Sequence, residues 1–284
     1  MMLHEDKFDL MVHLHRPRFE LYQLPFVCEQ MTYTVSTGDI LYPVQELKDL
    51  GVIVSSDLSW RKHINAIVSR AKAVASWVFS VFKTRDTLTM LTLYKSVVRS
   101  HLEYCCILWN PSSLTDIQLL ESVQRTFTSR IWGVQHLNYW ERLGALGLMS
   151  LQRRRERDII IQMWKLLYAR CPNDLNVQFS APSRQGTRAK VPTLNKSSSQ
   201  HHQTLYDNSF AVLGPRLWNT LPSHLPEIAD LETFKHNLTK FLLTFSDNPP
   251  VAGYKCANDN SILQWCKNKA GATLLGRSQN TMTQ

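Results

Sequence analysis

The chain reads SWRKHINAIVSRAKAVASWVFSVFK from residue 59 to residue 83. Its apolar residues recur at spacings of three and four, the period of an amphipathic α-helix. They are Ile64, Ile67, Val68, Ala71, Val74, Ala75, Val78 and Phe82. Asp57 or Ser59 is placed to cap the N-terminus of this helix. Five basic residues lie largely off the apolar stripe and form a candidate charged surface: Arg61, Lys62, Arg70, Lys72 and Lys83.

The same spacing predicts four further helices, so that residues 59–171 form a helical bundle. The residues at which these helices begin or end are Asp86-Thr87, Asn110-Pro111, Ser113 with Asp116, Gly133, Asn138 with Glu141, Ser150 and Cys171-Pro172. Ser113 and Asp116 have the spacing of a capping box. In the helix that follows Asp86, the stripe places these residues on the inner face: Leu91, Tyr94, Val97, Val98 and Leu102.

Residues 1–58 have a different period. Apolar and polar residues alternate around Leu10 and Tyr33, and Leu50–Val54 is a short apolar run, which together predict a small β-rich unit. Such a short sheet needs partners to be stable, and these are expected to lie upstream of Met1.

The remainder of the chain divides into three parts. Residues 172–205 are rich in Pro, Ser, Gln, Arg and Lys and have no period, as in a linker. Residues 206–245 predict a smaller helical unit in which Asp230 caps a helix, and residues 246–284 predict a weakly ordered tail. The expected fold is therefore mainly α, with a helical bundle between a small β-rich unit and a smaller helical unit.

The positive charge is concentrated in the predicted bundle. The 284 residues carry 32 Lys and Arg against 23 Asp and Glu, a net charge of +9. Residues 59–170 hold 17 basic and 7 acidic side chains, whereas residues 1–58 hold 4 and 9, and residues 171–284 hold 11 and 7. A basic surface on one module indicates an anionic partner, the alternative being a solvated basic face with none.

Several protein classes are excluded by the sequence. No run of 18 apolar residues could span a membrane, and the N-terminus lacks the pattern of a secretory signal. No phosphate-binding loop, nucleophile elbow or zinc-binding helix motif is present, so no complete active site and no cofactor are expected. The six cysteines have neither disulfide-framework nor zinc-knuckle spacing, which favours reduced thiols in the nucleus or cytoplasm.

The sharpest local feature is the run Arg153-Arg154-Arg155-Glu156-Arg157, called here the arginine cluster. It falls in the first turns of a predicted helix, where the macrodipole already places positive potential. Two hypotheses explain how the charge is tolerated. In both, Asp158 and Glu156 offset part of the charge of Arg154 and Arg153 locally. Arg155 and Arg157 then either bind phosphates, or are approached in an internal network by Glu141 or by the C-terminal carbonyls of a neighbouring helix.

A second polar group combines Arg99, His101 and Glu103 near the end of a predicted helix. Residues two apart do not face each other on a helix, so catalysis by His101 with Glu103 is not expected. We expect instead a structural network in which Glu103 pairs with an arginine. The tryptophans are expected mostly in the core: Trp60, Trp77, Trp109, Trp132, Trp140 and Trp164.

An ordered set of short motifs resembles the C-terminal part of the reverse transcriptases of non-LTR (LINE-type, jockey-like) retrotransposons. The motifs are Lys48-Asp49-Leu50-Gly51-Val52, Arg99–Cys105 with Trp109-Asn110-Pro111, Leu119–Arg125, Glu141–Leu148, Ser150–Arg155, Trp218–Pro222 and Thr233-Phe234-Lys235. The resemblance covers roughly residues 3–245 in the family's order. Each motif is weak alone, and the ordered set is specific.

The resemblance implies a place in the polymerase for each part. Residues 1–58 would be the end of the palm, with Lys7 in the segment after the catalytic aspartates and Lys48 in the hairpin that grips the primer. Residues 59–171 would be the thumb, which closes over the template–primer duplex. The candidate nucleic-acid-binding residues are then Lys7, Lys48, Arg61, Lys62, Arg70, Lys72, Arg153, Arg154, Arg155 and Arg157.

The chain also departs from the family pattern. The family's magnesium-binding aspartate pair would stand upstream of Met1, and Ser100 replaces the usual proline between Arg99 and His101. We therefore expect a fragment that is no polymerase alone, with magnesium needed only by the full-length enzyme, and that binds RNA and DNA backbones without sequence preference. The alternative is a decayed or repurposed fragment that serves only packing or a protein partner.

Overall fold

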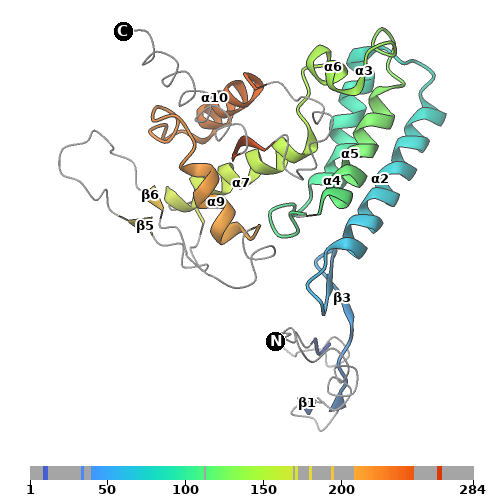
Figure 1. The fold of residues 1–284 in the computed structure, drawn as a ribbon. Coiled ribbons are helices and arrows are strands. Elements are labelled where there is room, and N and C mark those ends of the chain that lie inside the picture. The colour runs from blue at the N-terminus through green and yellow to red at the C-terminus, as the bar shows by residue number, and fades with distance from the viewer. Residues whose placement is uncertain are drawn as a thin grey trace, which may run out of the picture. The chain divides into compact units, whose positions relative to one another are not determined.

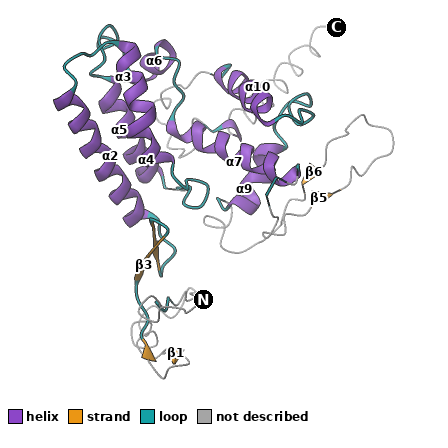
Figure 2. Ribbon diagram, turned by 180° about the vertical axis from the view of Figure 1, so that it is seen from behind, coloured by secondary structure: helices purple, strands orange, loops and turns teal. Residues whose placement is uncertain are grey.

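The computed structural model describes residues 9–11, 33–34, 40–111, 113–168, 170–171, 179–180, 193–194, 208–245 and 261–263. The fold is mainly helical, with a small β-rich part on the N-terminal side (Figures 1 and 2), which confirms the predicted fold class. The chain divides into two compact units, Met1–Ser69 and Arg70–Gln284. The boundary between the units, after Ser69, lies inside a helix and not at residue 58 as predicted. The candidate residue Lys7 lies outside the described residues.

The N-terminal unit contains two antiparallel hairpins. Strand β1 (Tyr33–Thr34) pairs with β2 (Ile40–Leu41), and β3 (Glu46–Asp49) pairs with β4 (Val52–Ser55). The turn between β3 and β4 is Leu50-Gly51, with φ of 45° and 86°. Two successive positive φ angles are what a type I′ hairpin turn requires. The predicted apolar strand therefore begins two residues later than expected.

Helices make up most of the second unit. They are α2 (Arg61–Val81, which begins in the first unit), α3 (Thr87–Leu93), the π-helical turn η2 (Tyr94–Val98), α4 (Arg99–Glu103), α5 (Leu114–Thr128), α6 (Tyr139–Ala145), α7 (Leu151–Leu167), α9 (Phe210–Trp218) and α10 (Leu231–Leu243). Within the predicted linker, β5 (Phe179–Ser180) pairs with β6 (Thr193–Leu194). The other residues of that linker lie outside the described part of the chain.

The helix predicted to follow Asp86 differs from expectation. It ends at Glu103 and not at Asn110, and its middle is the π turn η2. Its fully buried residues recur every four positions: Met90, Tyr94, Val98 and Leu102. The predicted inner residues Leu91 and Val97 are only half-buried.

Side-chain caps begin four of the described helices, α3, α6, α7 and α10. The sequence predicts three of these caps, at Asn138, Ser150 and Asp230. Asn138 and Glu141 form a complete capping box on α6, and Ser150 accepts a hydrogen bond from the Arg153 amide at the start of α7. Asp86 and Asp230 cap α3 and α10 in the same way. The capping box predicted at Ser113 is wrong, because this side chain makes no capping bond to α5.

Helix α7 lies at the centre of the second unit. It packs against α5 on one side and against α9 and α10 on another (Figures 1 and 2). Its successive residues Ile159, Ile160 and Ile161 are all buried, because neighbours cover several faces of the helix. The two helical modules that the sequence predicts as separate therefore share one core through α7.

Two other expectations need correction. Part of the predicted tail belongs to the core around α7, since Ile262 is 1% exposed and packs there. Trp109 and Trp164 are buried as predicted, but Trp77 and Trp132 are 57% and 55% exposed. A spacing pattern finds the helix, but it does not tell which of its flanks a neighbour will cover.

The capping box of α6 gives a test of the local structure. Replacing Asn138 by Ala removes two hydrogen bonds to the Trp140 and Glu141 amides. We expect the free energy of unfolding to fall by about 1 kcal/mol, measured by urea denaturation. The matched control is Ser113→Ala, where no capping bond is lost, and a similar loss in both variants would contradict this account.

Candidate nucleic-acid interface

The arginine cluster lies in the first half of α7 and is largely inside the protein. Arg153 and Arg155 are 3% and 2% exposed, and Glu156 between Arg155 and Arg157 is 6% exposed. The side chains of Arg154 and Arg157 retain 16% and 17% of their accessible surface.

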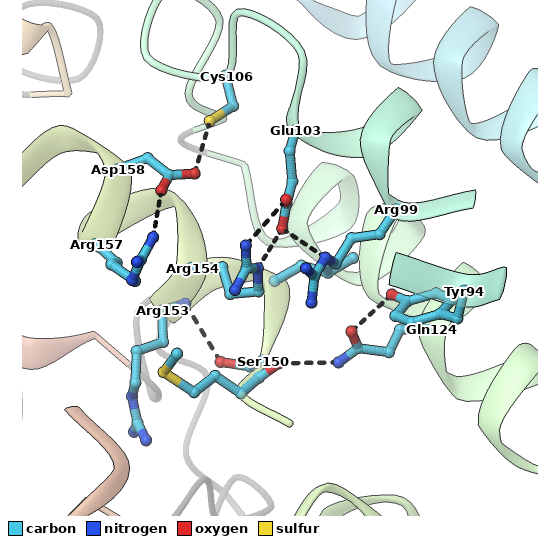
Figure 3. Close-up of polar contacts among 12 residues, drawn as sticks. Tyr94, Arg99, Glu103, Cys106, Gln124, Ser150, Arg153, Arg154, Arg157 and Asp158 are labelled. Carbon is cyan, nitrogen blue, oxygen red and sulfur yellow. Dashed lines mark hydrogen bonds and ion pairs between the residues drawn. The ribbon is translucent and has the colours of Figure 1, made fainter. Parts of the chain in front are cut away.

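Glu103 of α4 joins two arginines (Figure 3). It accepts hydrogen bonds from Nε and Nη2 of Arg154, the second at 3.0 Å, and lies 3.4 Å from Nε of Arg99. Burial alone would lower the pKa of Arg154, but the hydrogen bonds and charge of Glu103 outweigh it and raise that pKa. The predicted pairing of Glu103 with an arginine is thus present. His101 makes no hydrogen bond or ion pair with the residues that the structure describes.

Arg157 and Asp158 form a second pair on the same helix. Nη1 of Arg157 lies 3.2 Å from Oδ1 of Asp158, and its Nε donates to the Thr239 hydroxyl of α10 at 3.0 Å. Burial raises the pKa of Asp158, while Arg154 and Arg157 oppose that effect. These contacts connect α7 to α10.

Glu121 of α5 supplies negative charge at the N-terminus of α7. Its carboxylate accepts hydrogen bonds from the Leu151 amide at 3.1 and 3.3 Å, and another from the Tyr139 hydroxyl. A carboxylate at a helix N-terminus interacts favourably with the macrodipole. Glu121 therefore offsets part of the unfavourable potential that the arginines meet there.

Gln124, one turn further along α5, is completely buried, and both ends of its side-chain amide are hydrogen-bonded (Figure 3). Its Oε1 accepts from the Tyr94 hydroxyl at 2.7 Å, and its Nε2 donates to the Tyr139 hydroxyl at 3.0 Å and the Met149 carbonyl at 3.1 Å. A buried amide that makes all these bonds fixes one arrangement of the helices around it.

Arg155 and Glu156 are both buried. Burial lowers the pKa of Arg155, and the charge of Glu121 is the strongest opposing effect. Burial also raises the pKa of Glu156 to about 7. The Glu156 carboxylate accepts hydrogen bonds from the Ser261 hydroxyl and, at 2.8 Å, from the Ile262 amide. Arg153 donates to the carbonyl of Phe245, just after α10.

These contacts favour the internal network over phosphate binding for the arginine cluster. Arg153 and Arg155 are too buried to reach a phosphate at the surface, which corrects the expectation for these two residues. Arg154 and Arg157 are already paired with acids. The sequence could not separate the two hypotheses, because the covering helices α9 and α10 are distant in the chain.

The other candidate cations that the structure describes are exposed. In the first unit these are Lys48 on β3 and Arg61 and Lys62 on α2, of which Lys62 pairs with Glu46. In the second unit Arg70 and Lys72 are exposed on α2. The structure adds three exposed cations that sequence reasoning did not select: Lys95, Arg125 and Arg130. The scarcity of acids near Lys95 in the sequence was a signal that its charge would be unpaired.

Cys106 is a buried thiol that lies beside a carboxylate. The Cys106 thiol lies 3.9 Å from Oδ2 of Asp158, but burial raises its pKa to about 12, so it stays protonated near neutrality and is a poor nucleophile. Among the described residues, no three His, Cys, Asp or Glu side chains come together as metal ligands. The described helices also include none that is long and apolar enough to cross a membrane.

Comparison with known proteins gives limited information. No family model matches the sequence, and no solved structure matches it. An uncharacterized Caenorhabditis elegans protein is 26% identical over 191 residues, which cover 66% of this chain and 86% of the relative. That similarity assigns no activity.

Glu103 gives the first test of the internal network. The Glu103→Gln variant leaves Arg99 and Arg154 in a mostly buried place without a carboxylate. We expect a loss of about 3 kcal/mol in the free energy of unfolding, the low end for breaking a buried ion pair. The control is Glu232→Gln, which removes an exposed pair with Lys235 and should cost less than about 0.5 kcal/mol. Equal losses would show that the pair at Glu103 is no stronger than a surface pair.

Glu156 predicts a pH dependence of stability. Its pKa is about 7 in the folded protein against 4.5 for an ordinary glutamate, so the folded state binds more protons between these two values. The free energy of unfolding therefore falls as the pH rises through this window, by on the order of 2–3 kcal/mol. Glu156→Gln cannot ionise, so its stability should fall less than that of the parent between about pH 5 and pH 8 in denaturation curves. Parallel pH profiles would contradict the shifted pKa.

Proposed function

We propose that the chain binds the phosphate backbone of nucleic acids through exposed cations of its second unit. One observation supports this most directly. Arg70, Lys72, Lys83 and Lys95 are exposed and make no ion pair with any residue that the structure describes. Positive charge that the protein does not neutralise itself is available to an anionic partner.

The surrounding sequence strengthens this argument. Residues 59–102 contain eight Lys and Arg and a single acid, Asp86. That carboxylate caps α3, where it accepts a hydrogen bond from the Thr89 amide. The region therefore has almost no acid with which to pair its own cations. Contacts of this kind recognise phosphates and not bases, so binding should be independent of sequence.

The resemblance to non-LTR retrotransposon reverse transcriptases agrees with this proposal. In that family the corresponding region is the thumb, which contacts the template–primer duplex. We infer that the chain is a fragment of such an RNA-directed DNA polymerase, with no polymerase activity of its own. In the first unit, Lys48, Arg61 and Lys62 remain candidates for contacts with the same partner.

A second function is favoured by one surface feature. Trp77 and Val81 are 57% and 52% exposed and lie four residues apart on α2, on the same face. An exposed apolar face of this kind is also typical of a protein-binding surface. The alternative is therefore a repurposed fragment that binds a protein partner and no nucleic acid.

The dependence of binding on salt separates the two functions. In the full chain, we replace Arg70, Lys72, Lys83 and Lys95 together by Gln, which is also a good helix former. On B-form duplex DNA each lost phosphate contact should make the slope of log K against log salt shallower by about 0.9, so the quadruple change should reduce it by roughly 2–4. Fluorescence anisotropy over a range of salt concentrations measures both slopes.

A matched control replaces one buried arginine and one arginine that is already paired with an acid. The Arg155→Gln/Arg157→Gln variant should lower the melting temperature and leave the salt slope of the parent unchanged. If this control changes the slope and the quadruple variant does not, the exposed cations are not the binding surface. A parent protein with no salt-dependent affinity for duplex DNA or an RNA–DNA hybrid would refute the proposed function.

A further inference from the structure

Trp132 is held at the surface beside the end of α2. Its side chain is 55% exposed, although the preceding residue, Ile131, is completely buried. The Trp132 amide donates a hydrogen bond to the Arg85 carbonyl at 2.9 Å, which joins the segment after α5 to the segment after α2. Gly133 follows with φ of +83°, a backbone conformation that favours glycine. The exposed indole therefore has an anchored backbone.

Two arginines from the segments joined at Trp132 contact the same aromatic ring. The guanidinium carbons of Arg85 and Arg130 lie 5.0 and 4.9 Å from the ring centroid of Phe79. Arg85 is used internally, since it donates to the Phe79 and Thr84 carbonyls at 2.8 Å each. The Arg130 side chain is exposed and makes no hydrogen bond or ion pair with the described residues, so no acid among them neutralises its charge.

Helix α2 carries a further cation. Lys72 is exposed and precedes Phe79 by seven residues on α2, which places the two on the same face, about 10 Å apart along the axis. Asp86 is the acid next to Arg85, and its carboxylate accepts hydrogen bonds from the Thr89 amide and the Thr84 hydroxyl at the start of α3. No ion pair joins Arg130 or Lys72 to an acid among the described residues.

From this arrangement we propose that Trp132 stacks on a base of single-stranded nucleic acid while Arg130 neutralises an adjacent phosphate. The inference rests on the proposed function and adds a contact with bases to it. An exposed aromatic ring beside free cations is the combination that single-strand sites use, because every base has a face that can stack. The unpaired charge of Arg130 favours this ligand over an apolar protein surface, which would leave that charge without a partner.

Two oligomers of similar charge separate stacking from backbone binding. One is an oligothymidylate of about 20 nucleotides, and the other is an abasic oligomer of the same length. We expect the full-length parent to bind the oligothymidylate more tightly. Trp132→Ala should weaken that binding by about 5- to 100-fold and leave the affinity for the abasic oligomer unchanged. Fluorescence anisotropy gives the affinities, and a thermal melt shows that the variant is folded.

Three further variants sharpen the test. Trp132→Phe keeps a ring and should retain most of the preference for bases. Trp77→Ala removes a tryptophan of similar exposure that lies on α2. This variant should bind both oligomers like the parent. Arg130→Gln should weaken binding to both oligomers, because both carry phosphates.

The outcomes distinguish this inference from the proposed function. If the parent binds both oligomers equally, or Trp132→Ala weakens both equally, the stacking contact is refuted while backbone binding stands. If the parent binds neither oligomer nor duplex DNA, the proposed function fails. Unchanged nucleic-acid affinity in Trp132→Ala together with loss of self-association in sedimentation would assign Trp132 to a protein contact and overturn the inference.

Discussion

Four arginines within five residues of α7 bring positive charge into the protein, and the second unit is arranged to neutralise it. Removing a guanidinium from water is unfavourable unless acids and hydrogen bonds replace the lost hydration. The acids come from three helices: Glu103 of α4, Glu121 of α5, and Glu156 and Asp158 of α7 itself. Because each acid must face α7, the network fixes how α4 and α5 lie against it.

The local parts of this arrangement could be predicted from the sequence. The caps at Asn138 and Ser150 depend on residues within three positions, and the pairing of Glu103 with an arginine follows from an acid among many cations. The burial of Arg155 could not be predicted, because the groups around it include Glu121 of α5 and Glu103 of α4, which come from more than thirty residues earlier in the chain. Three consecutive isoleucines at Ile159–Ile161 were the available signal that α7 is covered on more than one side, since a surface helix alternates apolar and polar faces.

The structure also divides the basic residues by what they can do. Arg154 and Arg157 of α7 pair with acids of the same chain, and Arg153 and Arg155 are buried, so these arginines contribute little external potential. Arg70 and Lys72 of α2, and Lys83 of the segment after it, have no such partners among the described residues. Net charge alone does not make this distinction, because a buried, neutralised arginine and an exposed free one count equally in the sum.

The π turn η2 has a consequence for the alignment of helix faces. Residues four apart on an α-helix drift by about 40° at each step, so Met90 and Leu102, three such steps apart, would diverge by about 120°. The wider turn at Tyr94–Val98 advances fewer degrees per residue and keeps both residues in the core. Glu103 follows Leu102 directly, so the direction in which its carboxylate points depends on the same turn. Whether Arg154 meets its acid is thus determined by the phase of a helix as much as by charge.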